Sequence, residues 1–544
     1  MAGARQARSE GGFIRRAESI EFRAPEPGQR FFNTGGPAEP SRHYVVPAVD
    51  RIPFARQMVE DGLYFAIKAP YRSGKTTLAN ELAREMEIDG RFRVLRLNFH
   101  ELKGANGLGA LTVCFFEVLK EALENSGDPV LSGVRFGNAK KPPRGAVKEI
   151  LGELCLALDK PLVLLIDEIH AIPRKRARFF FDVFFAGFQE RTRHRFPHSV
   201  VFFCVRDVFA PTARGKKGGS RNRGVRGGAL NIYRTVELPN LTFADICSLC
   251  DAHNAETGQF VDDEAKLKIW DLTEGQPFLV NAILGEALDF VLHGETAKPV
   301  TGQVVAEAAL GVARSRPAHL VRLMSFLKDP GVLKAVGEVL SGVSAKRPLF
   351  DEGTNLALDL GLLSLDGDDY LRPANRFVKD LALGALTEHM ALPGSLAGRF
   401  REGDEILASP LILEFQRYWK ERAGTWLKPF GEIPGALTRL ALMAFLRRAL
   451  GDDPAPETFP AVREDSLMIA VRRESKTYPI FATLGGASAP FREPEELSSF
   501  MDSRGASEGW VLSFDLDGLK SPEEKCRWKT LSLPRGKTVH LVGL

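Results

Sequence analysis

The sequence predicts an α/β fold with a parallel sheet covered by helices on both faces, followed by helical regions and a separate α+β tail. Apolar runs that suit fully buried strands alternate with helix-compatible segments between residues 63 and 238. The first run leads into a loop that contains Gly-Lys-Thr. A later run, residues 161–166, ends in two adjacent carboxylates. Open α/β sheets bind ligands at this end of their strands, so both features belong to one edge of the predicted sheet.

Five strands and four helices account for the predicted sheet domain. The expected strands are Leu63–Ala69, Phe92–Phe99, Leu162–Asp167, Ser199–Arg206 and Tyr233–Leu238. The expected helices begin near Gly74, Leu108 and Gly145, and a fourth spans Arg178–Arg193. Regular alternation of this kind is typical of parallel sheets, because parallel neighbours need a crossover connection.

The loop after the first strand reads Ala69-Pro-Tyr-Arg-Ser-Gly-Lys-Thr-Thr77. It matches the phosphate-binding pattern G-x-x-x-x-G-K-[ST], except that Ala69 stands where the first glycine is usual. Backbone N–H groups and the helix N-terminus would attract phosphates. We therefore predict ATP and Mg²⁺ as cofactors, with Lys75 at the β- and γ-phosphates and Thr76 ligating the metal. The alternative is that Gly-Lys-Thr opens an ordinary helix by coincidence and binds no nucleotide. The predicted nucleotide-binding residues in the loop are Ala69, Pro70, Tyr71, Arg72, Ser73, Gly74, Lys75, Thr76 and Thr77.

Two carboxylates follow the buried strand at 162–167. Asp167 would hold the water shell of Mg²⁺, and Glu168 would polarise the water that attacks the γ-phosphorus. An Asp-Glu pair can also be a plain helix N-cap, but Lys75 and Thr76 upstream favour a P-loop ATPase. Arg206, at the end of the fourth strand, could sense the γ-phosphate. The alternative is that Arg206 is an ordinary surface residue.

Composition sets the class of protein. The chain has 544 residues, of which 44% are hydrophobic, and we expect three or four domains. No apolar run approaches the roughly 20 residues that span a bilayer, and the N-terminus lacks the apolar core of a signal peptide. We expect a cytoplasmic protein without membrane contact. Six cysteines make no disulfide framework, and Cys247, Cys250 and His253 are better explained as helix residues than as a zinc site.

A basic segment follows the carboxylates. Residues 169–228 contain fourteen Lys and Arg against three Asp and Glu, a net charge of +11. The glycine-rich part, Arg214–Gly228, carries no acid. Such a loop would attract a phosphate backbone without reading its sequence, and a solvated loop without a ligand is weighed equally. DNA is therefore a candidate partner, through residues 174–228 and the winged helix expected further along the chain.

Six regions are expected along the chain. They are a disordered start at residues 1–31, the ATPase core at 32–240, a helical lid at 241–315, a winged helix at 316–392, a helical connector at 393–447 and an α+β tail at 448–544. A Gly and a Pro interrupt the lid within 273–281. The winged helix is expected from a helix at 356 onward that leads into two short strands joined by an Asp-Gly-Asp turn.

Several motifs in order carry a family resemblance. They are Phe32-Asn-Thr-Gly-Gly-Pro37, His43-Tyr-Val-Val-Pro47, the phosphate loop, Leu165-Ile-Asp-Glu-Ile-His170, Val205-Arg-Asp207 and Thr273-Glu-Gly-Gln-Pro-Phe-Leu-Val-Asn281. The chain resembles a bacterial family of AAA-like ATPases related to the signal-transduction (STAND) branch. The resemblance implies an N-terminal segment around the base, Arg206 as sensor, and Pro277 near the adenine. It also implies ATP and ADP as ligands, homo-oligomers, and Arg314 or Arg316 as candidate second sensors.

The tail resembles the PD-(D/E)xK nuclease fold. Arg463-Glu-Asp465 matches the first element of that pattern, but Phe481 and Thr483 stand where the later acid and lysine should be. Glu474-Ser-Lys476 matches by letter and falls in the turn before the strand. Two-metal hydrolysis needs more than one carboxylate, so we expect a nuclease-like domain without activity. The leading hypothesis is a slowly hydrolysing ATP-dependent switch; the alternatives are an ATP-regulated DNA-binding protein and an active ATP-dependent nuclease.

Overall fold

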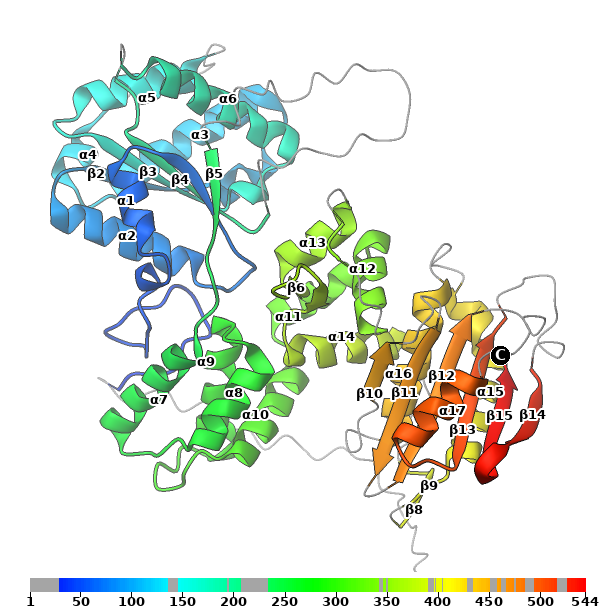
Figure 1. The fold of residues 1–544 in the computed structure, drawn as a ribbon. Coiled ribbons are helices and arrows are strands. Elements are labelled where there is room, and N and C mark those ends of the chain that lie inside the picture. Colours follow the sequence, from blue (N-terminus) through cyan, green and yellow to red (C-terminus); the bar gives the residue numbers. More distant parts are fainter. Residues whose placement is uncertain are drawn as a thin grey trace, which may run out of the picture.

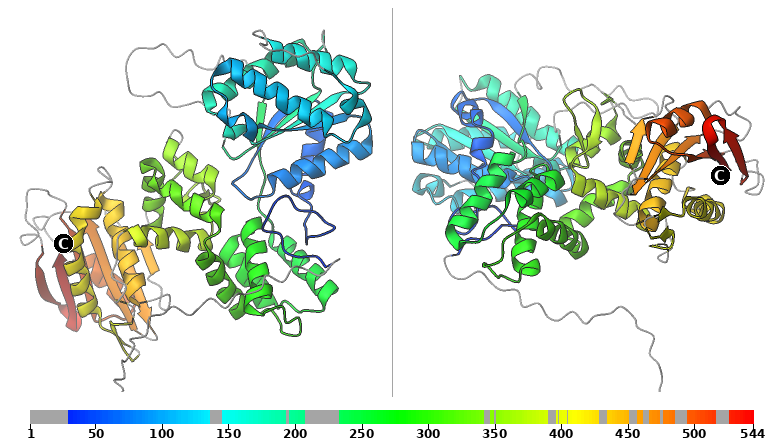
Figure 2. Two further views of the ribbon diagram at one scale, coloured as in Figure 1. Left: turned by 180° about the vertical axis from the view of Figure 1, so that it is seen from behind. Right: turned by 60° about the horizontal axis from the view of Figure 1, so that its bottom comes forward.

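The protein consists of a parallel-sheet core, a helical lid, a second helical region with a short hairpin, and a tail built on a mixed sheet (Figures 1 and 2). The computed structural model describes residues 29–135, 145–192, 195–206, 233–341, 346–348, 351–389, 396, 398–403, 405–427, 434–450, 457–460, 466–473, 476–484, 494–515 and 526–544. Three predicted features lie outside the described residues: most of the disordered start (1–28), the basic loop (207–232) and the Arg463–Asp465 element.

The core sheet has five parallel strands in the order β2-β3-β4-β1-β5. They are β1 (Tyr64–Lys68), β2 (Arg93–Asn98), β3 (Leu162–Asp167), β4 (Ser199–Cys204) and β5 (Tyr233–Glu237). All five predicted strands are confirmed. Because the sheet is parallel, the ends of β1, β3 and β4 meet at one edge, where the phosphate loop, the two carboxylates and Arg206 follow their strands.

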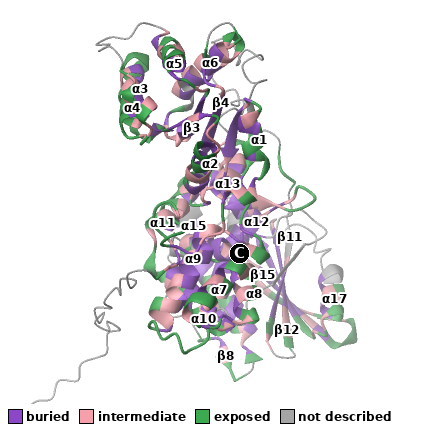
Figure 3. Ribbon diagram, turned by 90° about the vertical axis from the view of Figure 1, so that its left-hand side faces the viewer, coloured by how far each residue is buried: buried purple, intermediate pink, exposed green. Residues whose placement is uncertain are grey.

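Helices cover both faces of this sheet. They are α1 (Phe54–Glu60), α2 (Lys75–Asp89), α3 (Gly107–Glu124), α4 (Pro129–Gly133), α5 (Ala146–Ala157) and α6 (Arg174–Glu190), with short 3₁₀ turns η1 (Val49–Arg51), η2 (Phe99–Gly104) and η3 (Ile169–Ala171). Alternate residues of β1 to β4 enter two apolar clusters, one shared with α3, α5 and α6 and the other with α1 and α2. In Figure 3 the buried residues concentrate in strands such as β4, and exposed residues lie on the outer faces of α3 and α4. Thus the continuous apolar runs are explained by burial on both sides.

The lid follows β5 and is helical, as predicted. Its elements are α7 (Phe243–Thr257), α8 (Asp263–Thr273), α9 (Pro277–Glu286), a π turn η5 (Ala287–Val291) and α10 (Gly302–Ser315). The predicted interruption lies between α8 and α9. Gly275 there has φ +72°, and a Cβ would lie 1.8 Å from the Leu241 carbonyl oxygen, so only glycine fits. Gly275 also accepts a hydrogen bond from Leu241 N–H, which ties the lid to the end of the core.

Cys247, Cys250 and His253 lie on α7, as predicted. His253 is buried, and its ring nitrogens contact the Tyr44 hydroxyl and the Gln259 amide oxygen. Within the described residues no cluster of three His, Cys, Asp or Glu could hold a metal ion.

The N-terminal segment joins core and lid. Arg30 pairs with Glu256 at 2.7 Å, and Phe31 forms a bridge with His43. These two residues, at the end of the segment expected to be disordered, therefore make defined contacts. Phe32 is buried, and its ring lies 5.7 Å from the ring of His253 in the lid, centroid to centroid.

The region after the lid, which we call the hairpin module, contains α11 (Ala318–Ser325), η6 (Phe326–Lys328), α12 (Pro330–Leu340), α13 (Glu352–Leu360), β6 (Leu363–Leu365), β7 (Leu371–Pro373) and α14 (Arg376–His389). Its two strands pair antiparallel around a turn in which Asp366 accepts hydrogen bonds from the backbone N–H groups of Asp368 and Tyr370. The expected helix, strand, turn and strand are present in this order.

The tail sheet has six strands in the order β10-β11-β12-β13-β15-β14. The tail elements are β8 (Arg401–Glu402), β9 (Glu405–Ile406), α15 (Ala408–Leu427), α16 (Pro434–Leu450), β10 (Glu457–Pro460), β11 (Ser466–Arg473), β12 (Lys476–Leu484), α17 (Pro494–Ser503), β13 (Glu508–Phe514), β14 (Trp528–Leu533), η9 (Pro534–Gly536) and β15 (Lys537–Gly543). β10 to β12 form an antiparallel meander, and β12 pairs parallel with β13 after α17. The region expected to be a helical connector, 393–447, contains the paired short strands β8 and β9 as well as α15 and most of α16. α15 packs on the tail sheet, since Phe415 and Trp419 contact Phe514.

Two of the nuclease-pattern positions lie on β12. Phe481 is fully buried in an apolar cluster with Leu497 and Met501 of α17, so a core residue stands where the nuclease pattern would have an acid. One prediction is wrong in detail: Lys476 is the first residue of β12 rather than part of the turn before it, and it pairs with Glu405. None of the helices in the described part of the chain is long and apolar enough to cross a bilayer.

Candidate nucleotide site

The loop between β1 and α2 is held in a fixed conformation by its neighbours. Gly74, the N-cap of α2, has φ +91°, and a Cβ there would lie 3.3 Å from Arg51 Nη1. Arg51 donates to the Ser73 carbonyl at 3.0 Å, and Ser73 Oγ donates to the Pro70 carbonyl at 2.7 Å. Arg72, also at positive φ, donates to the Gly35 carbonyl at 2.6 Å. The bend that the pattern requires is thus present despite Ala69.

Lys75 lies inside this loop. Its side chain is buried, and Nζ donates to the carbonyl oxygens of Ala69 and Pro70 at 2.9 and 2.6 Å. Burial lowers the Lys75 pKa to about 8, although Asp167 nearby favours the charged form. A buried ammonium at a helix N-terminus fits an anionic ligand, because phosphate would supply the charge that its surroundings lack.

The loop and the carboxylates meet at Thr76. Its Oγ1 donates to Asp167 Oδ2 at 2.7 Å, which brings together two residues 91 positions apart. Asp167 Oδ1 accepts from Glu168 N–H at 2.8 Å. A hydroxyl and a carboxylate side by side are hard oxygen ligands of the kind that Mg²⁺ uses beside phosphates. The arrangement therefore fits the predicted metal.

Glu168 is the next residue and has a left-handed backbone, with φ +58°. Burial and the neighbouring Asp167 raise the pKa of its carboxyl. Its Oε2 lies 3.3 Å from His170 Nε2. Burial, with Lys75 and Arg206 nearby, lowers the His170 pKa to about 3, so the imidazole is neutral at physiological pH.

The three arginines named from the sequence lie in different places. Arg206 follows β4 by two residues and is close enough to His170 to lower its pKa. Arg314 and Arg316 are exposed at the end of α10 and do not line the cavity described below. Arg322 of α11, which we did not predict, does line it; its guanidinium lies 4.8 Å from the Tyr71 ring centroid and donates to the Tyr71 hydroxyl at 3.2 Å.

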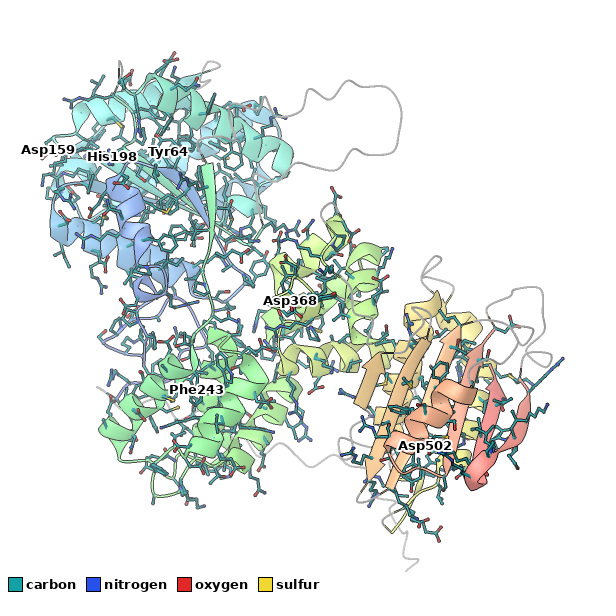
Figure 4. All side chains as sticks on the ribbon, viewed as in Figure 1. Tyr64, Asp159, His198, Phe243, Asp368 and Asp502 are labelled. Carbon is teal, nitrogen blue, oxygen red and sulfur yellow. The ribbon has the colours of Figure 1, made fainter. Side chains whose placement is uncertain are left out.

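A cavity of about 870 Å³ opens beside the phosphate loop and is lined by residues of the core, the N-terminal segment, the lid and the hairpin module. Figure 4 shows these parts of the chain with their side chains. Its lining includes most of the predicted site: Ala69, Pro70, Tyr71, Arg72, Gly74, Lys75, Thr76, Thr77, Glu168 and Pro277. Ser73, Asp167 and Arg206 are not among the lining residues. The volume suits a nucleoside triphosphate, since ligand sites typically measure about 300–1,000 Å³.

The lid supplies the apolar wall of the cavity. Pro277 is the first residue of α9, and the Phe278 ring contacts His319 of the hairpin module at 3.9 Å between centroids. Gln276 Nε2 reaches the Tyr71 carbonyl at 3.5 Å. This wall and the N-terminal residues 33–38 line the same space.

The hairpin module touches the phosphate loop directly. Lys68, the last residue of β1, pairs with Asp359 of α13 at 3.2 Å and with Glu237 of β5 at 2.9 Å. A Cβ added to Gly361 would lie 3.0 Å from Pro70 Cβ. Arg372 also pairs with Glu274 of the lid at 2.5 Å. Sequence reasoning missed these contacts because their partners are far apart in the chain.

Comparison with known proteins agrees with this geometry for the core. Residues 67–205 match AAA, the ATPase family associated with various cellular activities. None of the curated proteins compared with the sequence matches it.

Among solved structures, the chain is similar to a Walker-type ATPase of Pyrococcus abyssi, with 12% identity and a TM-score of 0.42 over 61% of this chain and 95% of the other. The ORC2 protein of Aeropyrum pernix, in ADPNP–ADP complexes, is 12% identical with a TM-score of 0.31, over 62% of this chain and 93% of the other. The Holliday junction branch migration motor RuvB of Thermotoga maritima is 14% identical with a TM-score of 0.30, over 60% of this chain and 89% of the other. At such values the similarity says nothing of what the present chain acts on. The family match and the strand order identify residues 67–205 as an AAA-type P-loop ATPase domain.

Proposed function

We propose that the protein is a Mg-ATP-dependent molecular switch, in which the bound nucleotide sets the position of the hairpin module and tail relative to the core. One observation carries the proposal: the cavity beside the phosphate loop is lined by core, lid and hairpin module together. A ligand that contacts three parts of a chain has a different affinity for their closed and open arrangements, and this difference is what shifts a conformational equilibrium.

The residues of the site would divide the chemistry as follows. Thr76 and Asp167 would hold Mg²⁺, which when bound neutralises charge on the β- and γ-phosphates. Lys75 would contact the same phosphates, and Glu168 would orient the attacking water. Arg206 would contact the γ-phosphate from the end of β4. Electrostatic stabilisation of the transferring phosphoryl group is the main catalytic term in such sites.

Turnover would be slow, because a switch needs long-lived states. The contacts between Lys68 and Asp359 and between Gly361 and Pro70 favour the closed arrangement described above. A change in the conformation of the phosphate loop would be transmitted to the hairpin module through these two contacts. The PD-(D/E)xK-like tail would then act as an effector that keeps its fold without nuclease chemistry, as the buried Phe481 suggests.

Titration calorimetry with Mg-ATP and Mg-ADP tests the site. We expect wild-type protein to bind both, and Lys75→Ala to lose binding because the buried cation is removed. Lys148→Ala is the matched control, since Lys148 pairs with Glu190 on the surface of α5 and α6. Tight binding by Lys75→Ala would refute the site. Glu168→Gln should bind normally and lose steady-state phosphate release, leaving only a residual rate measurable in single turnovers; an unchanged rate would exclude Glu168 as the residue that orients water.

A second candidate function is ATP-regulated DNA binding. The net charge of +11 in residues 169–228 and the winged-helix-like hairpin module favour it. Binding driven by phosphate contacts must weaken steeply with salt. A gel-shift series on duplex DNA at low and at physiological salt tests this, and absence of a complex at low salt would remove this candidate. Self-association, expected from the resemblance, is tested by mass measurement with and without ATP.

A further inference from the structure

His170 joins Glu168 to the end of strand β4. Its Nδ1 accepts a hydrogen bond from the backbone N–H of Val205 at 3.4 Å. Because Nδ1 is an acceptor, the proton of the neutral ring must be on Nε2. Nε2, which therefore carries the proton, lies 3.3 Å from Glu168 Oε2. The two ring nitrogens thus face Val205 on one side and the Glu168 carboxylate on the other.

The ring has little freedom to turn. Only 6% of the His170 side chain is exposed, and its ring meets the Tyr71 ring edge-on at 5.6 Å between centroids. The η3 turn that carries it is fixed by the hydrogen bond from Ala171 N–H to the Glu168 carbonyl at 2.8 Å and by the fully buried Ile169. A rigid donor of this kind limits the rotamers of the carboxylate that it contacts.

Glu168 needs such a restraint. Its backbone lies in the left-handed region, and its side chain is 31% exposed at the cavity wall. A carboxylate there could take several rotamers, of which only some would place an oxygen beside the attacking water. The protonated Nε2 of His170 lies 3.3 Å from Oε2, so a hydrogen bond to Oε2 would leave the other carboxylate oxygen to accept from water.

We propose that His170 is a positioning residue for ATP hydrolysis: it orients the Glu168 carboxylate and couples that orientation to the end of β4, next to Arg206. The proposal rests on the ATPase function proposed above. It differs from a packing role beneath Tyr71, because packing would be kept by any side chain of similar bulk, whereas orientation requires a donor at the Nε2 position. Loss of a correctly placed group in a reacting site lowers the rate without weakening substrate binding.

Substitution of His170 by Gln or by Asn distinguishes its contact with Glu168 from its contact with Val205. The amide of Gln reaches the Nε2 position, so His170→Gln keeps a donor to Glu168; the amide of Asn reaches only the Nδ1 position, so His170→Asn keeps the contact to Val205 alone. We expect His170→Asn to lower kcat roughly tenfold with KM unchanged, and His170→Gln to keep most of the wild-type kcat. Equal rates for the two variants, a change in KM alone, or a faster His170→Asn would overturn the proposal.

A double-mutant cycle tests whether His170 acts through Glu168. Single-turnover rates with enzyme in excess are compared for wild type, His170→Ala, Glu168→Gln and the double variant. If His170 works through the carboxylate, His170→Ala slows the wild type and causes no further loss in Glu168→Gln; an equal loss in both backgrounds would contradict the proposal.

His198→Gln is the matched control, since His198 contacts Glu60 at the opposite end of β4 and should keep the wild-type rate. Fluorescent Mg-ATP binding is measured on each preparation. Absence of binding by wild type would refute the ATPase function itself, whereas normal binding and turnover that are insensitive to the His170 variants would refute only the role of His170.

Discussion

Removal of the Asp359 carboxylate should loosen the hairpin module from the phosphate loop. Asp359 and Lys68 are 11% and 17% exposed, and their contact at 3.2 Å joins α13 to the end of β1. Glu237 contacts the same ammonium at 2.9 Å but belongs to the core strand β5. Asp359→Ala therefore removes a contact between the module and the core, whereas Glu237→Ala removes one within the core.

The size of the effect follows from this geometry. A hydrogen bond to a charged group contributes about 1.5–3 kcal/mol, and more when its loss leaves a buried charge unpaired. Lys68 keeps Glu237 in the variant, so we take the lower figure. About 1.5 kcal/mol corresponds to roughly a tenfold shift toward the open module. The exposed Glu237, by contrast, should contribute less than about 1 kcal/mol.

The release of fluorescent ADP, chased with excess unlabelled ADP in a stopped-flow instrument, measures this shift. We expect release from Asp359→Ala to be about tenfold faster than from wild type, since the bound nucleotide leaves through the opened cavity. Glu237→Ala should stay close to wild type. Equal release rates from Asp359→Ala and wild type would mean that the module does not control access to the site.

Three further predictions follow from the structure. Gly361→Ala should also speed ADP release, because Gly361 has φ +77° and its added Cβ would meet Pro70 at 3.0 Å; an unchanged release rate would contradict it. Burial and Arg72 lower the His319 pKa to about 4 from 6.5, so below pH 6.5 only the unfolded chain takes up this proton. The melting temperature should therefore be lower at pH 5 than at pH 7, and this decrease should be smaller in His319→Phe than in wild type. An equal decrease in the two proteins would refute this prediction. Plasmid DNA should stay intact with Mg²⁺ or Mn²⁺, and metal-dependent cleavage that Asp465→Ala abolishes would show an active tail.

The core was predictable from sequence because its strands are continuous apolar runs and its helices begin at marked positions. β3 and β4 are buried almost throughout, and Gly74 starts α2 where the pattern places it. α6 was shifted, since it begins at Arg174, after Pro173, rather than at Arg178. β14 was not predicted, because none of its residues is buried and they form no continuous apolar run.

The candidate site was predictable in part for a related reason. Asp167 ends β3 and Thr76 lies just after β1, and the carboxyl ends of these parallel strands share one edge of the sheet, so their meeting at 2.7 Å could be expected from topology. Arg322 and Asp359 could not, because they reach the site from helices 251 and 291 residues away from their partners Tyr71 and Lys68. Their roles depend on how the module docks, and no local pattern encodes docking. His170 stood within a recognised motif, but only the three-dimensional contacts with Glu168 and Val205 indicate what it does.

A distance measurement between core and tail tests the switch most directly. Spin labels can be placed at Ile88 of α2 and Leu413 of α15, which are 79% and 56% exposed, in a variant whose six native cysteines are replaced. The account predicts different distance distributions with Mg-ADP and with a non-hydrolysable ATP analogue, and loss of this difference in Lys75→Ala. One distribution, identical with both nucleotides although both are bound, would contradict it.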